Sequence, residues 1–318
     1  MGTPSPSNVS TKLQRIAELA SQSPQMAFTT LNHHIDIELL HEAHRRTRKG
    51  GAAGVDGQTA EDYAADLEAN LHRLHDRFKS GTYQAPPVRR VRIPKGDGRQ
   101  TRPIGIPTFE DKIVQRAVEM VLYVIYDVNF YDFSYGFRRG RNQHQALSEL
   151  REQCLKLNIG WIVDADVSGF FDNLDHGLLR EFIKQRVNDG GILRLIGKWL
   201  KAGVLEGEQI TYPERGTPQG GVISPLLSNI FLHHVLDDWF VKDVQPRMKG
   251  RCFLIRFADD FVIGFENETD ASRVMKVLPK RFARFGLSIH PKKSRLIQFR
   301  RPNGIRNTAK ENGTFNFL

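Results

Sequence analysis

Cysteine is scarce in this sequence, with only Cys154 and Cys252 among 318 residues. The two stand in unrelated surroundings, which argues against a disulfide framework or a cysteine-ligated zinc site and fits a reducing compartment. Long apolar runs are also missing, since none approaches the roughly 18–20 residues that a membrane span needs. The opening segment, MGTPSPSNVS, is polar and turn-forming, unlike a signal peptide. We therefore expect a cytoplasmic chain without a membrane partner.

Acidic residues are fewer than basic ones. Lys and Arg number 46 against 36 Asp and Glu, which gives a net charge of +10 and a pI near 9.7. Such a balance favours a polyanionic partner. Charge alone leaves open whether that partner is a nucleic acid or whether the protein simply has one basic face.

Regular alternation of strands and helices is absent too, so an α+β class is favoured over a doubly wound α/β fold. We expect residues 1–10 to be disordered and a helical pattern to run from Thr11 to about Arg48. Further helical patterns cover residues 59–79, 110–127, 224–239 and 270–285. Residues 86–107 alternate basic and β-branched side chains around a glycine-rich tip and predict a basic β-hairpin. Strands are predicted at 159–167, which carries Asp164 and Asp166 on one face, and at 286–299.

Glycine is lacking at the tip of the hairpin expected in RFADDFVIGF (256–265), where a tight turn would need it most. Two apolar runs meet at Asp259 and Asp260, whereas tight hairpin turns favour Asn-Gly, Asp-Gly or Gly-Gly because they need positive φ. Two carboxylates about 4 Å apart repel by about 4 kcal/mol at an effective dielectric of 20. A divalent cation bound between the two carboxylates turns their repulsion into a net attraction, and carboxylates on rigid elements are natural Mg²⁺ ligands. The alternative reading of an isolated Asp-Asp pair is a solvated turn.

Six sequence blocks occur in an order that resembles the group II intron-encoded reverse transcriptases. They are RPIGIPTFEDKIVQRAV, YDFSYGFRRGRNQHQAL, VDADVSGFFDNLDH, RGTPQGGVISPLLSNIFLHHVLDDW, RFADDFVIGF and GLSIHPKKSRL. The resemblance covers roughly residues 30–318. It implies an α+β right-hand polymerase with fingers, a palm built on an antiparallel sheet, and a helical N-terminal extension.

The resemblance also implies a division of the chain. The N-terminal extension would take residues 1–50, the fingers 51–158 with the hairpin at 86–107, and the palm 159–318, with part of 177–215 packing with the fingers. The thumb, which is also the maturase domain, would be absent because the chain stops at TFNFL. We expect a weak grip on the template–primer duplex and poor processivity from such a chain.

Asp166, Asp259 and Asp260 match the family's catalytic carboxylates, which hold two Mg²⁺ ions, with Mn²⁺ as a possible substitute. Asp166 rather than Asp164 is the match, because the aromatic Phe171 follows five residues later. Asp164 would have an outer-shell or structural role. Val167, beside Asp166, belongs by the same resemblance to the metal-binding and substrate-binding positions.

Lys95 and Arg102 stand on the two arms of the basic hairpin and match the residues that neutralise the incoming triphosphate. Lysine offers a point charge and arginine a bidentate fork to phosphate oxygens. Phe171 matches the gate beneath the sugar, whose bulk excludes a 2′-hydroxyl. Core packing is the alternative for Phe171, as its neighbour Phe170 is expected to be core.

Gln219, in TPQGG, matches the residue near the sugar and base of the nucleotide. Lys293 best matches the lysine proposed to protonate pyrophosphate, with Lys292 as the alternative. Phe257 is a substrate position where the family usually has Tyr, so a hydroxyl near the primer end is missing.

The implied activity is RNA-directed DNA synthesis by a nucleotidyltransferase in a bacterial cell. Its partners would be an RNA template, a DNA primer, a dNTP and structured intron RNA of a mobile element. A homodimer is compatible with the sequence, which does not fix the oligomeric state. One alternative is an RNA-binding maturase-type splicing cofactor without polymerisation. Another is a related enzyme used in phage defence or CRISPR spacer acquisition.

Overall fold

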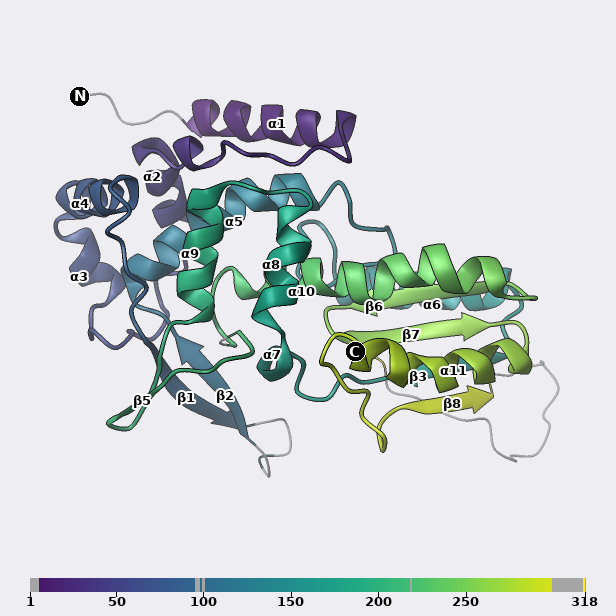
Figure 1. Cartoon of the computed structure of the whole chain (residues 1–318). Helices are drawn as coiled ribbons and strands as arrows, with labels where there is room; N and C mark the ends of the chain where they lie inside the picture. Colours follow the sequence, from purple (N-terminus) through teal and green to yellow (C-terminus); the bar gives the residue numbers. More distant parts are fainter. Residues whose placement is uncertain (1–5, 95–97, 99–100, 218, 299–316, 318) are drawn as a thin grey trace. The chain divides into compact units, whose positions relative to one another are not determined.

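The computed structural model describes residues 6–94, 98, 101–217, 219–298 and 317. They divide into two units, one made of 1–129 with 174–227 and the other of 130–173 with 228–318. Each unit combines helices with a four-stranded sheet of its own (Figure 1), which confirms the α+β class. No helix in the described ranges is long and apolar enough to cross a membrane.

The first unit is built around a buried helix. Its helices are α1 (Pro6–Gln22), η1 (Asn32–His34), α2 (Ile37–Arg46), α3 (Ala60–Ala64), α4 (Leu67–Lys79), α5 (Phe109–Tyr126), α8 (His176–Lys184) and α9 (Gly190–Leu200). α5 begins after Thr108, whose side chain accepts a hydrogen bond from the Asp111 amide. Most residues of α5 are buried, and α1 and α2 pack against it.

The sheet of the first unit has the order β2-β1-β4-β5. Its strands are β1 (Val88–Pro94), β2 (Thr101–Ile106), β4 (Val204–Glu206) and β5 (Gln209–Thr211). β1 and β2 pair antiparallel from Arg89↔Ile106 to Pro94↔Thr101, as predicted for the basic hairpin. β1 also pairs with β4, in parallel.

Two predictions for the first unit are wrong in detail. The segment 1–10 was expected to be disordered, yet α1 begins at Pro6, a residue well suited to the first turn of a helix. Its apolar face, which includes Val9 and Leu13, is buried. The helix predicted at 59–79 is two helices, because Asp66 leaves the helical region with φ −131° and ψ 51°.

The second unit carries an antiparallel sheet in the order β6-β7-β3-β8 (Figure 1). Its strands are β3 (Trp161–Ala165), β6 (Cys252–Phe257), β7 (Asp260–Phe265) and β8 (Arg295–Gln298), and its helices are α6 (Gln143–Lys156), α7 (Phe170–Asn173), η2 (His233–Asp237), η3 (Phe240–Val244), η4 (Gln245–Arg247) and α11 (Glu268–Ala283). The residues of α10 (Ser224–Leu232) fall in both units.

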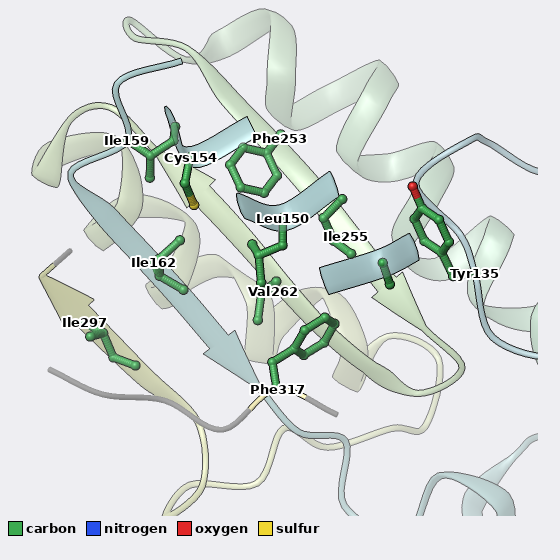
Figure 2. Packing of buried hydrophobic residues seen from close by; sticks show 11 residues of the cluster. Tyr135, Leu150, Cys154, Ile159, Ile162, Phe253, Ile255, Val262, Ile297 and Phe317 are labelled. Carbon is green, nitrogen blue, oxygen red and sulfur yellow. The ribbon is translucent and has the colours of Figure 1, made fainter. Parts of the chain in front are cut away.

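Helices cover both faces of this second sheet. On one face, Leu150 and Cys154 of α6 pack with Val262 of β7 in one apolar cluster, which Figure 2 shows together with Phe317. On the other face, Phe261 stacks on Phe282 of α11 with ring centroids 5.8 Å apart. Because successive side chains of a strand point to opposite faces, the neighbours Phe261 and Val262 bind different helices.

Two further predictions need correction in the second unit. The strand expected at 286–299 is limited to β8 within the described residues of that segment. The helix expected at 224–239 is α-helical to Leu232 and then includes the wider π-helical turns η2 and η3. α6 belongs to the segment 51–158 that the resemblance assigns to the fingers, and it packs against β6.

Candidate active site

The double aspartate lies at the tip of the β6–β7 hairpin. Phe257 pairs with Asp260, so Ala258 and Asp259 form a two-residue turn. Ala258 has φ 57°, the left-handed conformation that a tight turn requires. For a residue with a Cβ this conformation costs about 1–2 kcal/mol. The turn is therefore built without glycine, and the surrounding structure must hold it in place.

Asp166 comes to the same end of the sheet. β3 pairs with β7 up to Ala165↔Phe261, so the next residues along the two strands, Asp166 and Asp260, lie beside each other. The main chain of Asp166 is fixed on both sides. Its amide donates to Ser294 Oγ at 3.1 Å, and its carbonyl accepts from the His290 amide at 2.8 Å.

Electrostatics show that these carboxylates crowd one another. Desolvation, together with the charges of Asp259 and Asp166, raises the pKa of the Asp260 carboxyl to about 6. The Lys293 ammonium opposes this shift and lies 3.0 Å from Asp166 Oδ2. Within the described ranges, no three His, Cys, Asp or Glu side chains are already gathered as a metal-ligand set. The cluster offers hard oxygen donors, one of them paired with a lysine.

Asp164 forms an ion pair with a residue of the neighbouring strand β8. It lies 3.5 Å from Arg295, its direct partner in the β3–β8 ladder. Burial raises the pKa of the Asp164 carboxyl above its usual value, and the arginine opposes that rise. This ion pair ties two neighbouring strands together, in keeping with the structural role considered for Asp164.

Val167 is buried directly after Asp166 and forms a bridge with Ile289. The two hydrogen bonds that flank this bridge are made by the neighbouring residues, Ser168 to the Ser288 carbonyl and His290 to the Asp166 carbonyl. The peptide groups of Val167 therefore face away from the 288–290 segment.

The two aromatic positions differ in their surroundings. Phe171 is half-buried at the start of α7 and makes an edge-to-face contact with Phe170, whose ring is buried and also packs on Phe231. Core packing thus applies to Phe170, as predicted. Phe257 is half-buried and packs against the apolar cluster of Figure 2.

In the first unit, Arg102 is exposed on β2, and Lys95 falls outside the described residues. The loop that carries Gln219 lies against the same strand, because the Gly105 amide donates to the Gln219 carbonyl at 2.6 Å. A Cβ on Gly220, which has φ 117°, would stand 2.5 Å from the Gly105 carbonyl oxygen. Glycine is thus required for this close approach.

Sequence reasoning missed the residue that holds the aspartate turn, Arg256. Its side chain is fully buried and hydrogen-bonds to Asp237, Asn229, Ser134 and the Ala258 carbonyl. One signal was available, since an arginine interrupts an otherwise apolar strand, FLIRF. Its partners come from distant segments that no local pattern connects to it.

Comparisons with known proteins point to one family. The family model described as "Reverse transcriptase (RNA-dependent DNA polymerase)" matches residues 93–318. The group II intron-encoded protein LtrA of Lactococcus lactis subsp. cremoris is 38% identical over 241 residues, which cover 74% of this chain and 39% of that protein. Protein YkfC of Escherichia coli (strain K12) is 38% identical over 232 residues, 71% of this chain and 61% of that protein.

The putative COX1/OXI3 intron 1 protein of Saccharomyces cerevisiae is 31% identical over 218 residues, 68% of this chain and 26% of that protein. The aligned part of the chain thus spans from 26% to 61% of the length of these three relatives.

Proposed function

This chain belongs to the reverse transcriptase (RNA-dependent DNA polymerase) family, in its group II intron-encoded branch, and we propose that it extends a DNA primer on an RNA template. The observation that carries this proposal is the meeting of Asp166 with the Asp259-Asp260 turn at one end of the β3–β7 pair. In our assignment the second unit acts as the palm, and the first unit supplies the N-terminal extension and the fingers.

We assign Asp166, Asp259 and Asp260 to hold two Mg²⁺ ions, or Mn²⁺ in their place, with the Val167 carbonyl as a further ligand. The fit rests on the donor set, because carboxylate and carbonyl oxygens suit these hard cations. The raised pKa of Asp260 supports it, since burial and the charges of Asp259 and Asp166 outweigh the opposing Lys293 ammonium. When bound, two such ions activate the primer 3′-hydroxyl and stabilise the leaving pyrophosphate.

Lys293 would supply the proton to the departing pyrophosphate. Its ammonium is already at the site, 3.0 Å from Asp166, and 61% of its side chain is exposed. That contact favours Lys293 over Lys292 for the role. In the free protein the same ammonium forms an ion pair with Asp166. Once a cation binds the Asp166 carboxylate, the ammonium would be free to bind a phosphate oxygen.

Arg102 and Lys95 are assigned to the triphosphate of the incoming dNTP, and Gln219 to its sugar and base. Support comes from the contact between the Gln219 loop and β2. A Cβ on Gly220 would stand 2.8 Å from Ile104 Cγ2, and Ile104 shares its strand face with Arg102, so the loop lies on the face that carries Arg102. Phe171 would lie beneath the sugar and exclude a 2′-hydroxyl. Phe257 would contact the primer end through its ring alone.

Structured intron RNA is the further partner that we propose. The net charge of +10 supports a polyanionic ligand, and the matched relatives include group II intron-encoded and intron proteins by name. The competing function is an RNA-binding splicing cofactor that does not polymerise.

Primer extension separates the two functions. A DNA primer annealed to an RNA template is incubated with dNTPs and Mg²⁺, using the wild type and the Asp259→Ala/Asp260→Ala variant, while RNA binding is measured in parallel. We expect extension by the wild type only, with equal RNA affinity for both proteins. Tight RNA binding without extension by the wild type would instead favour the splicing cofactor.

A further inference from the structure

Among the described residues of the second unit, Arg256 is the largest charged side chain that is fully buried. It has no exposed surface, although it interrupts the apolar strand β6 only two residues before the turn. Burying a guanidinium is costly unless each of its N–H groups finds an acceptor. Its burial is therefore tolerated only if acceptors around it bind its N–H groups.

All five donors of the guanidinium are used. Nε and Nη2 bind the two carboxylate oxygens of Asp237 at 2.8 and 2.7 Å, and Nη2 also donates to Ser134 Oγ at 2.8 Å. Nη1 donates to Asn229 Oδ1 at 2.8 Å and to the Ala258 carbonyl at 2.9 Å. The last bond reaches the strained residue of the turn itself, directly before Asp259.

The proposed function requires the turn carboxylates to keep a fixed position toward Asp166. We propose that Arg256 is the positioning residue for the metal-binding turn: its guanidinium, held by Asp237, clamps the Ala258 carbonyl and so sets where Asp259 and Asp260 stand. The inference rests on the proposed function, because it concerns the cations that those carboxylates hold.

The clamp acts through geometry and not through its charge. Asp237 is also fully buried and forms a bidentate ion pair with the guanidinium. The Arg256–Asp237 pair therefore adds little net charge beside Asp166, Asp259 and Asp260. Asp237 belongs to the π-helical turn η2, and such turns are common where a side chain must be delivered to a functional site.

Arg256 is also connected, through Asn229, to the segment around Gly136 that packs against the turn. Asn229 accepts from Arg256 through its Oδ1 and donates through its Nδ2 to the Gly136 carbonyl at 2.8 Å. Gly136 lies so close to the turn that a Cβ there would stand 2.2 Å from the Ala258 nitrogen. One guanidinium thus fixes the turn from inside and, through Asn229, the backbone packed against it.

Lysine cannot reproduce this arrangement, because it offers three donors on a flexible stem instead of five in a planar fork. Arg256→Lys keeps the charge opposite Asp237 but loosens the Ala258 carbonyl. Loss of outer-shell support typically lowers metal affinity or activity about 10–100-fold. We expect the Arg256→Lys variant to need at least about 10-fold more divalent cation for half-saturation.

The experiment measures cation binding directly as well as activity. Mn²⁺ is titrated into the wild type, Arg256→Lys and Asn229→Ala and followed by electron paramagnetic resonance, and the Mg²⁺ concentration for half-maximal primer extension is determined in parallel. Arg186→Lys is the matched control, because Arg186 is another buried guanidinium whose bonds go to the Ala20, Ser23 and Met26 carbonyls of the first unit.

The expected result is a shift of both half-saturation concentrations for Arg256→Lys, a smaller shift in the same direction for Asn229→Ala, and none for Arg186→Lys, whatever its loss of thermal stability. Asn229→Ala keeps the ion pair with Asp237 and decides the question if Arg256→Lys does not fold. Unchanged half-saturation in every folded variant overturns the clamp. A wild type that neither binds Mn²⁺ nor extends primers would instead overturn the proposed function.

Discussion

Gly136→Ala tests how tightly the aspartate turn is packed. The added Cβ would stand 2.2 Å from the Ala258 nitrogen, 2.8 Å from the Phe257 carbonyl carbon and 3.0 Å from the Ala258 Cα. These atoms are backbone, so no flexible side chain can move aside. The backbone on both sides is tied down as well, since the Tyr135 amide donates to the Arg256 carbonyl at 2.8 Å.

The magnitude follows from forced overpacking. A methyl group inserted into a well-packed site typically costs about 1–3 kcal/mol. An unfolding entropy of about 2.1 cal/mol/K per residue makes 1 kcal/mol worth roughly 1.5 °C of Tm in a chain of 318 residues, so Gly136→Ala should lower Tm by about 1.5–4.5 °C. The turn that carries the two aspartates must also move, and primer extension should fall by more than the loss of folded protein explains.

The assay is differential scanning calorimetry beside primer extension at a temperature where both proteins are folded. Gly197→Ala is the control, because a Cβ at this α9 position meets nothing within 4 Å. It should leave Tm unchanged or raise it, as alanine is the better helix former by about 0.5–1 kcal/mol. Equal Tm and equal extension for Gly136→Ala and the wild type would refute the close packing of Gly136 against the turn.

Three further predictions concern other parts of the chain. Burial raises the pKa of Asp111 from its ordinary 3.8 to about 6, so the folded protein holds a proton that the unfolded chain releases between those values, and this residue's contribution to stability falls as pH rises through that window. The Tm advantage of the wild type over Asp111→Asn should accordingly shrink between pH 4 and 6.5, and a constant or growing difference would contradict the assignment. Arg102→Ala should raise the KM for dNTP with little effect on primer binding. Arg92→Ala on the same hairpin should not, because Arg92 already pairs with Glu206 of β4 at 2.8 Å; equal KM changes in steady-state kinetics would speak against a triphosphate role. Phe171→Ala should increase ribonucleotide incorporation, and unchanged discrimination in single-nucleotide addition would remove the residue from the gate.

The sequence was most informative where chemistry and local pattern coincide. Asp166 could be assigned through the family resemblance, in which the aromatic Phe171 follows five residues later, whereas the Asp259-Asp260 pair stands out because it joins two apolar runs. In the structure, antiparallel pairing of β3 with β7 brings the two together. The basic hairpin was predictable for the same reason, since its alternation has the period of a strand.

Tertiary features were not predictable in this way. The positive φ of Ala258 is tolerated because Arg256 binds the Ala258 carbonyl and because Gly136, remote in sequence, packs closely against the Ala258 backbone. The helix of residues 224–239 has an uninterrupted apolar pattern, yet it widens into π-helical turns that place Asp237 against Arg256. The positive φ and the π-helical turns depend on tertiary contacts that local sequence propensity does not predict.

Iron-mediated cleavage would show whether Asp166 and the aspartate turn together hold the catalytic cations. Fe²⁺ replaces Mg²⁺ and, with ascorbate and peroxide, cuts the backbone next to its binding site. We expect cuts confined to residues 164–168 and 257–261, suppressed by excess Mg²⁺ and lost in Asp259→Ala/Asp260→Ala. Cleavage elsewhere, or cleavage at these positions that survives the double substitution, would contradict it.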